Sequence, residues 1–258
     1  TGYGVYREMV HNMFSHAGAV RIDHVLGLFR LWWIPQGEGA RGGAYVTYDY
    51  EAMIAILTIE ASRVNGLVVG EDLGTVPDYV RTVLGEHGLL GCMVEWFARV
   101  DDSPNAGDPY ADPSTYRKYA LASVTTHDLP PTAGYLQFEH VKLREQLHLL
   151  SGPVEEFQAS ATAERDAMMD RLVESGLITP EMAGDVEGHI QEIVEAMHKM
   201  LLKSPSVLLQ AALVDGATQM VALRQILLPL AVPGMVTTGL LAFIEAWSEF
   251  LYARTFTI

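Results

Sequence analysis

The chain has 258 residues, of which 49% are apolar, enough for one large domain or two small ones with a real core. Its formal net charge is −15, and all of it lies in residues 1–216, because the few charged residues after Gly216 cancel. A domain this acidic repels nucleic acid and anionic lipid, so neither is expected as its partner, whereas a neutral substrate is unaffected. Cys92 is the only cysteine, which excludes an internal disulfide and fits a reducing, cytoplasmic location. The first residues have no signal-peptide pattern and no initiator Met, so we expect a fragment of a longer protein.

Helix and strand signals alternate through the first part of the chain. In chain order, the apolar spacing predicts a helix over residues 5–16, a strand over 19–23, a glycine-rich loop over 36–48, a helix over 50–64 and a strand over 67–71. The last of these is a continuous apolar run, which is typical of a strand buried on both faces.

The same alternation continues in the second part. The pattern predicts a helix over residues 78–85, a strand over 91–96, a solvated loop over 101–114, a strand over 119–124, three or four helices within 136–204 and a strand over 206–211. Strands that alternate with helices indicate parallel βα units and therefore an α/β fold. About five strands are predicted, whereas a closed barrel needs eight. An open doubly wound sheet fits the same alternation, so the pattern leaves both architectures open.

Three acidic residues each follow a predicted strand, namely Asp23, Glu71 and Asp128. Barrels of βα units keep their catalytic side chains at the carboxyl ends of the strands. A pair of carboxylates, helped by a third, is the set of groups that acts on a sugar acetal. The order and placement of the three acids therefore favour a glycoside-processing site.

The two carboxylates of the predicted pair have different surroundings. Arg21 lies two residues before Asp23, on the same face of the strand, where it can hold that carboxylate ionised, as a nucleophile requires. Glu71 closes an apolar strand, and partial burial favours the protonated form that a general acid needs. The alternatives are a turn or cap role for Asp23 and a cap for the helix after Pro77, which Asp72 could supply instead of Glu71.

The remaining polar and aromatic residues allow several interpretations. Asp128 follows His127 and is either a helix cap or a clamp for two sugar hydroxyls. The aromatic residues around the glycine-rich loop are either core or sugar-stacking platforms; they are Phe29, Trp32, Trp33, Tyr45 and Tyr48. No metal-ligand spacing and no phosphate-binding loop supports another chemistry, so neither a metal nor a cofactor is expected.

Residues 1 to about 215 resemble the second half of the 4-α-glucanotransferase family, the amylomaltases or disproportionating enzymes. The stretches that carry the resemblance are HAGAVRIDHVLGLFRLWWIP, GGAYVTY, VVGEDLGTVP, SVTTHDLPPTAGY and SPSVLLQAAL, in the family's order and spacing. The resemblance implies a partial (β/α)8 barrel of the α-amylase type, about five of eight strands, with a helical insertion. It also implies that the first three strands are absent, which would impair activity.

The resemblance assigns a role to each residue of the site. It implies that Asp23 is the nucleophile, Glu71 the general acid/base and Asp128 the stabiliser of the transition state. Five residues are expected to bind substrate or support the site: Arg21, His24, His127, Trp32 and Tyr45. The implied reaction transfers α-1,4-glucan segments between maltodextrins or starch-derived glucans, by a retaining double displacement.

The end of the chain resembles a different protein. Gln210-Ala211-Ala212, Gly216 and, nine residues later, Ile226-Leu227-Leu228-Pro229 resemble the cytoplasmic coupling loop of an ABC sugar-importer permease, with Gln210 in place of Glu. No residue from Gln225 to Ile244 is charged, a run long enough to span a bilayer or to form a buried core helix. We therefore interpret residues 1–215 as a catalytic barrel, residues 216–258 as a hydrophobic helical tail, and the sequence as a chimera.

Two functions other than glucan transfer remain open, of which the tail supports one. If it were a genuine permease segment, it could insert in a membrane and contact an ABC ATPase. The other alternative is that the protein binds glucan without catalysing any reaction on it.

Overall fold

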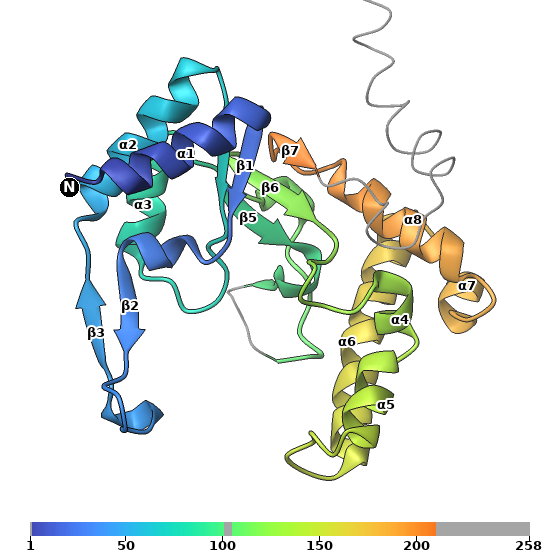
Figure 1. The fold of residues 1–258 in the computed structure, drawn as a ribbon. Helices are drawn as coiled ribbons and strands as arrows, with labels where there is room; N and C mark the ends of the chain where they lie inside the picture. The colour runs from blue at the N-terminus through green and yellow to red at the C-terminus, as the bar shows by residue number, and fades with distance from the viewer. Residues whose placement is uncertain (1, 101–104, 210–258) are drawn as a thin grey trace, which may run out of the picture. The chain divides into compact units, whose positions relative to one another are not determined.

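The structure, a computed structural model, describes residues 2–100 and 105–209 (Figure 1). It divides into two compact units. The first comprises Thr1–Val124 with Leu201–Gln210, and the described part of the second is residues 125–200. Parallel strands form the centre of the first unit, and the described part of the second is helical.

Five short parallel strands build the first unit: β1 (Ala19–Ile22), β4 (Leu67–Gly70), β5 (Gly91–Val94), β6 (Ala120–Ser123) and β7 (Leu208–Leu209). β1 pairs with β4, and β6 pairs with both β5 and β7. A parallel bridge between Val69 and Leu90 joins the two groups. All five predicted strands are therefore confirmed. Their order along the sheet follows the sequence, whereas a doubly wound sheet reverses its order at a switch point.

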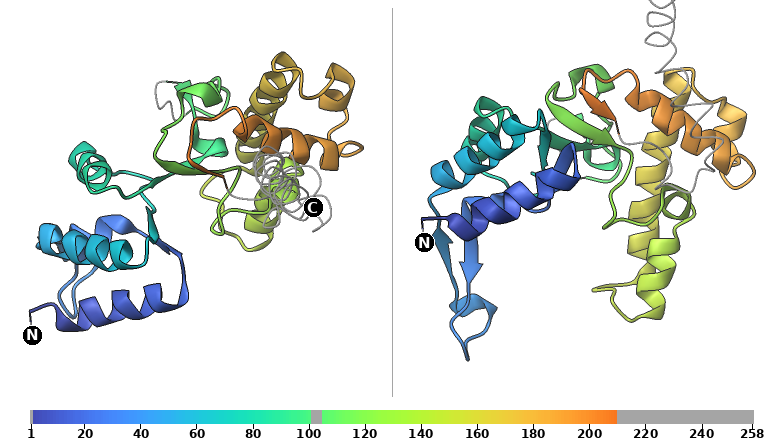
Figure 2. Two further views of the ribbon diagram at one scale, coloured as in Figure 1. Left: turned by 90° about the horizontal axis from the view of Figure 1, so that it is seen from above. Right: turned by 45° about the horizontal axis from the view of Figure 1, so that its top comes forward.

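Three helices cover one side of β1 and β4 in the first unit: α1 (Gly4–His16), α2 (Tyr50–Arg63) and α3 (Asp78–Glu86) (Figure 2). The side chain of Asp49 caps α2 by accepting the Ala52 N–H at 3.2 Å. The helices and the strands share one buried core, which includes Val10, Phe14, Ile54, Leu57, Val68, Val80 and Leu84.

The other side of the strands carries a smaller apolar cluster made of Val69, Leu90 and Cys92, with Leu121 and Leu208 packed against it. Successive residues of a strand point to opposite faces, so Val68 joins the helix-covered core while Val69 joins this second cluster. Arg21 is the register partner of Val69 and therefore lies on the same face. This face holds the candidate site.

A β-hairpin interrupts the run of parallel units. β2 (Arg30–Trp33) and β3 (Ala44–Thr47) pair antiparallel, and no residue of either strand is buried. The predicted loop over residues 36–48 is therefore wrong for its last part. The apolar pattern missed β3 because a strand exposed on both faces has no buried face to mark in the sequence.

The second unit contains α4 (Thr132–Leu136), α5 (Glu139–Gln146), α6 (Val154–Glu174), α7 (Pro180–Gly184) and most of α8 (Ile190–Leu201). This confirms the predicted helical segment. The Tyr135 hydroxyl donates to Glu164 at 2.7 Å and thereby ties α4 to α6. The fully buried side chains of the second unit include Met168 and Leu172 on α6 and Ile193 and Met197 on α8.

Short 3-10 helices complete the described structure; they are Val25–Leu28, Ala40–Gly42, Glu95–Phe97 and Pro113–Thr115. Within residues 2–100 and 105–209, no helix is both long enough and apolar enough to cross a membrane. The predicted hydrophobic tail, residues 216–258, lies outside the described residues.

A charged cluster joins α1 to α2 and predicts a pH-dependent stability. The buried Glu60 carboxylate contacts His11 Nδ1 at 3.0 Å and Arg63 Nη1 at 2.6 Å. The hydrogen bond with His11, together with Arg63, lowers the pKa of Glu60 despite its burial. A lowered pKa favours the ionised form in the folded state, so this stabilisation is present above the unfolded value near 4.5 and is lost as the pH falls below it.

We therefore expect Glu60→Gln to lower the thermal midpoint of the chain at pH 7, with a difference from wild type that shrinks below about pH 4.5. Circular dichroism melts of both proteins between pH 3.5 and 7 measure it. Glu8→Gln, at an exposed position on α1, is the control and should change little at any pH. A difference that grows towards acid pH would contradict the assignment.

Candidate active site

The two carboxylates of the predicted pair follow neighbouring parallel strands. Ile22 and Gly70 are register partners, and Asp23 and Glu71 come directly after them. The ladder continues past the strand ends, because the Glu71 N–H donates to the Ile22 carbonyl at 2.8 Å. Both acids lie an even number of residues from the partners Arg21 and Val69, so they belong to the same face of the sheet. The structure thus brings these two predicted residues together.

Asp23 is held by an ion pair. The Arg21 guanidinium lies 2.7 Å from the Asp23 carboxylate, with both side chains partly exposed. The predicted pairing of Arg21 with Asp23 is therefore confirmed. At this exposure the pair contributes modest stability, about 1 kcal/mol or less, so its main effect is to orient the carboxylate.

Glu71 is buried, with 6% of its surface exposed, and both of its oxygens accept hydrogen bonds. The backbone N–H of His24 donates to Oε2 at 2.9 Å, and that of Leu73 donates to Oε1 at 2.6 Å. The ring of His24 lies 3.2 Å from the same carboxylate. His24 adopts the left-handed conformation, with φ 46°, and this turn directs its N–H to Glu71. The predicted substrate-binding residue His24 therefore contacts the candidate acid/base.

The hairpin presents its aromatic residues to solvent. Trp32 and Tyr45 are register partners with ring centroids 4.9 Å apart, and about half of each side chain is exposed. The Trp32 indole N–H donates to the Ala40 carbonyl at 3.0 Å, which fixes the ring over Gly43. A side chain at position 43 would overlap that ring, so the glycine is required. Trp32 and Tyr45 are therefore surface residues, whereas Phe29, only 1% exposed, belongs to the core.

Asp128 and His127 belong to the second unit, in the turn before α4. His127 Nε2 lies 3.4 Å from the Asp128 carboxylate, and both side chains are more than half exposed. The alternative role of Asp128 as a helix cap is wrong, because Pro131 begins α4 without a side-chain cap. The convergence of Asp128 with Asp23 and Glu71 stays a prediction.

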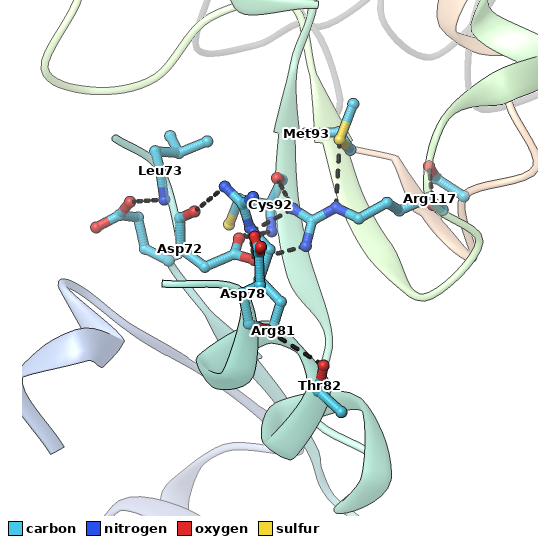
Figure 3. A network of polar contacts seen from close by, with 10 residues as sticks. Asp72, Leu73, Asp78, Arg81, Thr82, Cys92, Met93 and Arg117 are labelled. Carbon is cyan, nitrogen blue, oxygen red and sulfur yellow. Dashed lines mark hydrogen bonds and ion pairs between the residues drawn. The ribbon is translucent and has the colours of Figure 1, made fainter. Parts of the chain in front are cut away.

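Two residues beside the pair were not predicted as part of the site: Asp72, which was considered only as a helix cap, and Arg117. Asp72 is 1% exposed and forms a two-pronged ion pair with Arg117, at 2.5 and 3.0 Å (Figure 3). The suggestion that Asp72 caps the helix after Pro77 is therefore wrong. Burial raises the pKa of the nearby Cys92 thiol, with a further increase from the Asp72 charge, so this thiol is neutral near pH 7.

The described residues contain no group of three or more His, Cys, Asp or Glu that could hold a metal ion. The polar groups that the structure places on this face include two carboxylates, one ion-paired with arginine and one buried among backbone donors.

The fold and the site together define a class of protein. It is an α/β protein built of parallel βα units, with a pair of carboxylates at the ends of two adjacent strands. The family model of 4-alpha-glucanotransferase matches residues 1–229, beyond the expected boundary near 215. The chain belongs to this 4-alpha-glucanotransferase family.

Individual proteins that are similar to this chain are also named 4-alpha-glucanotransferase. A 4-alpha-glucanotransferase of Mycobacterium tuberculosis is 49% identical over 214 residues, 83% of this chain and 29% of the relative. One from Haemophilus influenzae is 37% identical over 186 residues, 71% of this chain and 26% of the relative. The chain thus spans about three-tenths of the length of these proteins.

Solved structures share the fold. The crystal structure of amylomaltase from Corynebacterium glutamicum superposes with a TM-score of 0.74 at 35% identity, covering 81% of this chain and 30% of that chain. The amylomaltase from Streptococcus agalactiae, solved in complex with acarbose, has a TM-score of 0.52 at 16% identity over 81% of this chain and 35% of its own, which indicates the fold alone.

A second similarity confirms the predicted resemblance to a permease. The sulfoquinovosyl glycerol transport system permease protein SmoH of Agrobacterium fabrum is 48% identical over 52 residues, 20% of this chain and 18% of that protein.

Proposed function

We propose that this chain carries the catalytic pair of a 4-α-glucanotransferase, which transfers α-1,4-glucan segments between maltodextrins. The observation that carries the proposal is the placement of Asp23 and Glu71 directly after register partners on β1 and β4. Neighbouring strands lie about 4.8 Å apart. Retaining enzymes hold their carboxylates about 5–5.5 Å apart, whereas inverting enzymes need roughly 6.5–9.5 Å. Adjacent strands therefore favour the retaining mechanism.

In this mechanism Asp23 attacks the anomeric carbon of the donor, forming a covalent glucosyl ester as the bond to the leaving oxygen breaks. Glu71 gives its proton to that oxygen. It then takes a proton from the hydroxyl of an incoming sugar, which attacks the ester and releases Asp23. The ion pair with Arg21 orients the Asp23 carboxylate for this attack.

The neutral glucan is recognised by the other predicted residues. Trp32 and Tyr45 are both about half exposed on the hairpin, with Arg30 over one face of the Tyr45 ring, and sugar rings can stack on their exposed parts. Residues 36–43, within the connection between β2 and β3, would shield the glucosyl ester from water, so that an acceptor sugar reacts first. Asp128 is proposed as the clamp for two hydroxyls of the reacting sugar, with His127 beside it.

The proposed architecture is a (β/α)8 barrel of the α-amylase type, and the sequential order of the strands β1, β4, β5, β6 and β7 supports it. The part of this chain that matches the Mycobacterium tuberculosis relative covers 29% of that protein, so the chain alone is expected to transfer glucan slowly. A cytoplasmic enzyme without cofactor is the matching cellular role.

Incubation with maltotriose tests the proposal, because transfer yields both glucose and longer maltodextrins whereas hydrolysis shortens every chain. We expect these products from the purified chain at low rate. We expect them at higher rate from a hybrid in which the matched 214 residues replace the corresponding segment of the Mycobacterium tuberculosis relative. Retention in amylose gels without products from either protein would instead indicate a glucan-binding protein.

The hairpin makes a separate prediction for substrate affinity. We expect Trp32→Ala to raise KM for maltotriose about tenfold and to leave kcat nearly unchanged, because a stacking contact worth roughly 1.4 kcal/mol acts on bound substrate and transition state alike. Initial rates in the hybrid measure it. Leu31→Ala, on the opposite face of β2, is the matched control. A fall in kcat at unchanged KM would contradict the stacking role.

The similarity to a permease supports a second candidate, a segment of an ABC sugar importer that inserts in a membrane and contacts an ABC ATPase. Fractionation of cells that express the chain distinguishes the two. The chain in the membrane fraction, released by detergent and not by salt, would favour transport. The chain in the supernatant, with maltotriose activity, would exclude it.

A further inference from the structure

The turn that holds Glu71 is anchored by its neighbour in the chain. Asp72 is 1% exposed, and its carboxylate accepts the backbone N–H of Cys92 at 2.8 Å. Arg117 donates to both oxygens of the same carboxylate and, at 2.5 Å, to the Cys92 carbonyl (Figure 3). The Asp72–Arg117 ion pair therefore binds both backbone groups of one β5 residue.

These bonds take the place of a missing piece of backbone ladder. β4 exchanges backbone hydrogen bonds with Leu90, the residue before β5, through Leu90 N–H to the Val68 carbonyl and Gly70 N–H to the Leu90 carbonyl. The next donor in a regular parallel ladder is Cys92. It donates to a side chain, that of Asp72, where β4 ends. Asp72 thus fixes the chain that leaves β4 against the start of β5.

The ion pair lies directly over Gly91. A Cβ at this position would be 2.6 Å from Arg117 Nη1 and 2.9 Å from Asp72 Oδ2, closer than real Cβ atoms approach such groups. Arg81 of α3 also lies beside Asp72, with its Nε 3.6 Å from the carboxylate and a long bond of 3.4 Å from its Nη2 to the Asp72 carbonyl. The Asp72 carboxylate is therefore contacted by two arginines, and its ion pair leaves no room for a side chain at position 91.

In the chain, Asp72 lies between Glu71 and Leu73, and the backbone N–H of Leu73 donates to the Glu71 carboxylate. That donor, Leu73, follows Asp72, so its position depends on the backbone conformation that the ion pair holds. On the basis of the function proposed above, we propose that Asp72, through Arg117 and Gly91, is a positioning residue that sets the geometry of the acid/base Glu71. Asp72 itself touches no reacting atom.

The test compares two donors in the hybrid enzyme. Maltotriose needs Glu71 for proton transfer, whereas maltosyl fluoride with azide needs neither acid nor base, because fluoride leaves unprotonated and azide attacks without losing a proton. We expect Asp72→Asn to lower kcat/KM on maltotriose about 100-fold, as misplacement by about 1 Å does. The loss with maltosyl fluoride and azide should be less than about threefold.

Gly91→Ala is the companion variant, since it displaces the ion pair without removing any charge. It should reproduce the same split between the two donors. Glu60→Gln, which removes another buried ion-paired carboxylate of this unit, is the control and should leave both rates unchanged. Equal losses on both donors, or no loss on either, would overturn the proposal.

Hydrogen exchange in the purified chain separates this inference from the proposed function. Exchange of the Leu73 and Cys92 amides should accelerate about tenfold in Asp72→Asn and Gly91→Ala, and not in Glu60→Gln. An unchanged Leu73 amide rejects the positioning role even if transfer is observed. A faster Leu73 amide in a chain and hybrid without any transfer supports the coupling and rejects only the catalytic assignment.

Discussion

Replacement of Asp23 with Asn is expected to abolish glucan transfer in the hybrid enzyme. The amide cannot form the glucosyl ester, so kcat should fall by roughly four orders of magnitude or more, as it does when other enzymes lose their nucleophile. Binding of maltotriose should persist, because the hairpin is unaffected. Initial rates and retention in amylose gels measure the two effects separately.

Asp170→Asn is the matched control, because it makes the same change at an exposed position of α6 and should leave the rate unaltered. A mechanism-based trap gives an independent check. A 5-fluoroglucosyl fluoride should label the wild-type enzyme on a peptide that contains Asp23 and should leave Asp23→Asn unlabelled. An Asp23→Asn variant with more than a tenth of the wild-type rate would refute the assignment.

Replacement of Glu71 with Ala is expected to have the second largest effect. Loss of the proton donor should lower kcat/KM on maltotriose by roughly 10²–10⁴-fold, the range that general acid–base catalysis contributes. Maltosyl fluoride should remain a donor for this variant, because its leaving group needs no proton.

Azide distinguishes the two carboxylates. Added azide should restore fluoride release from maltosyl fluoride in Glu71→Ala, with formation of a maltosyl azide of retained configuration, because azide attacks the ester without a base. It should not restore Asp23→Asn by this route. Rescue of neither variant by azide would exclude Glu71 as the acid/base.

Most strands were predictable from local sequence because β4, β5 and β6 are short apolar runs that are largely buried. Leu67 to Gly70 is an example, since the sequence marks it without reference to any partner. The hairpin strand Ala44–Thr47 was missed because nothing buries it, and its pairing with Arg30–Trp33 is a contact between segments. Asp23 and Glu71 could be singled out as a candidate pair because both acids directly follow predicted strands and lie in motifs that resemble those of the family.

The ion pair of Asp72 could not be predicted from the local sequence. Its position before a proline-started helix is typical of a cap, and only the structure reveals that its partners are Cys92 and Arg117, twenty and forty-five residues further along the chain. Gly91 gives a weak signal in the sequence, because a glycine at the start of a strand often indicates that another group packs closely against the backbone. The sequence does not identify that group, which the structure shows to be the Asp72–Arg117 ion pair.

The amino-acid sequence by itself determined which segments form strands and helices, which family the chain resembles and which acids follow the strands, because these depend on composition and spacing along the chain. Only the tertiary structure decided that β1 lies beside β4, that two backbone amides donate to the Glu71 carboxylate, and that a buried ion pair with Arg117 holds the neighbouring Asp72. The physical reason is that hydrogen bonds and ion pairs between distant segments depend on register and burial, which no local pattern records.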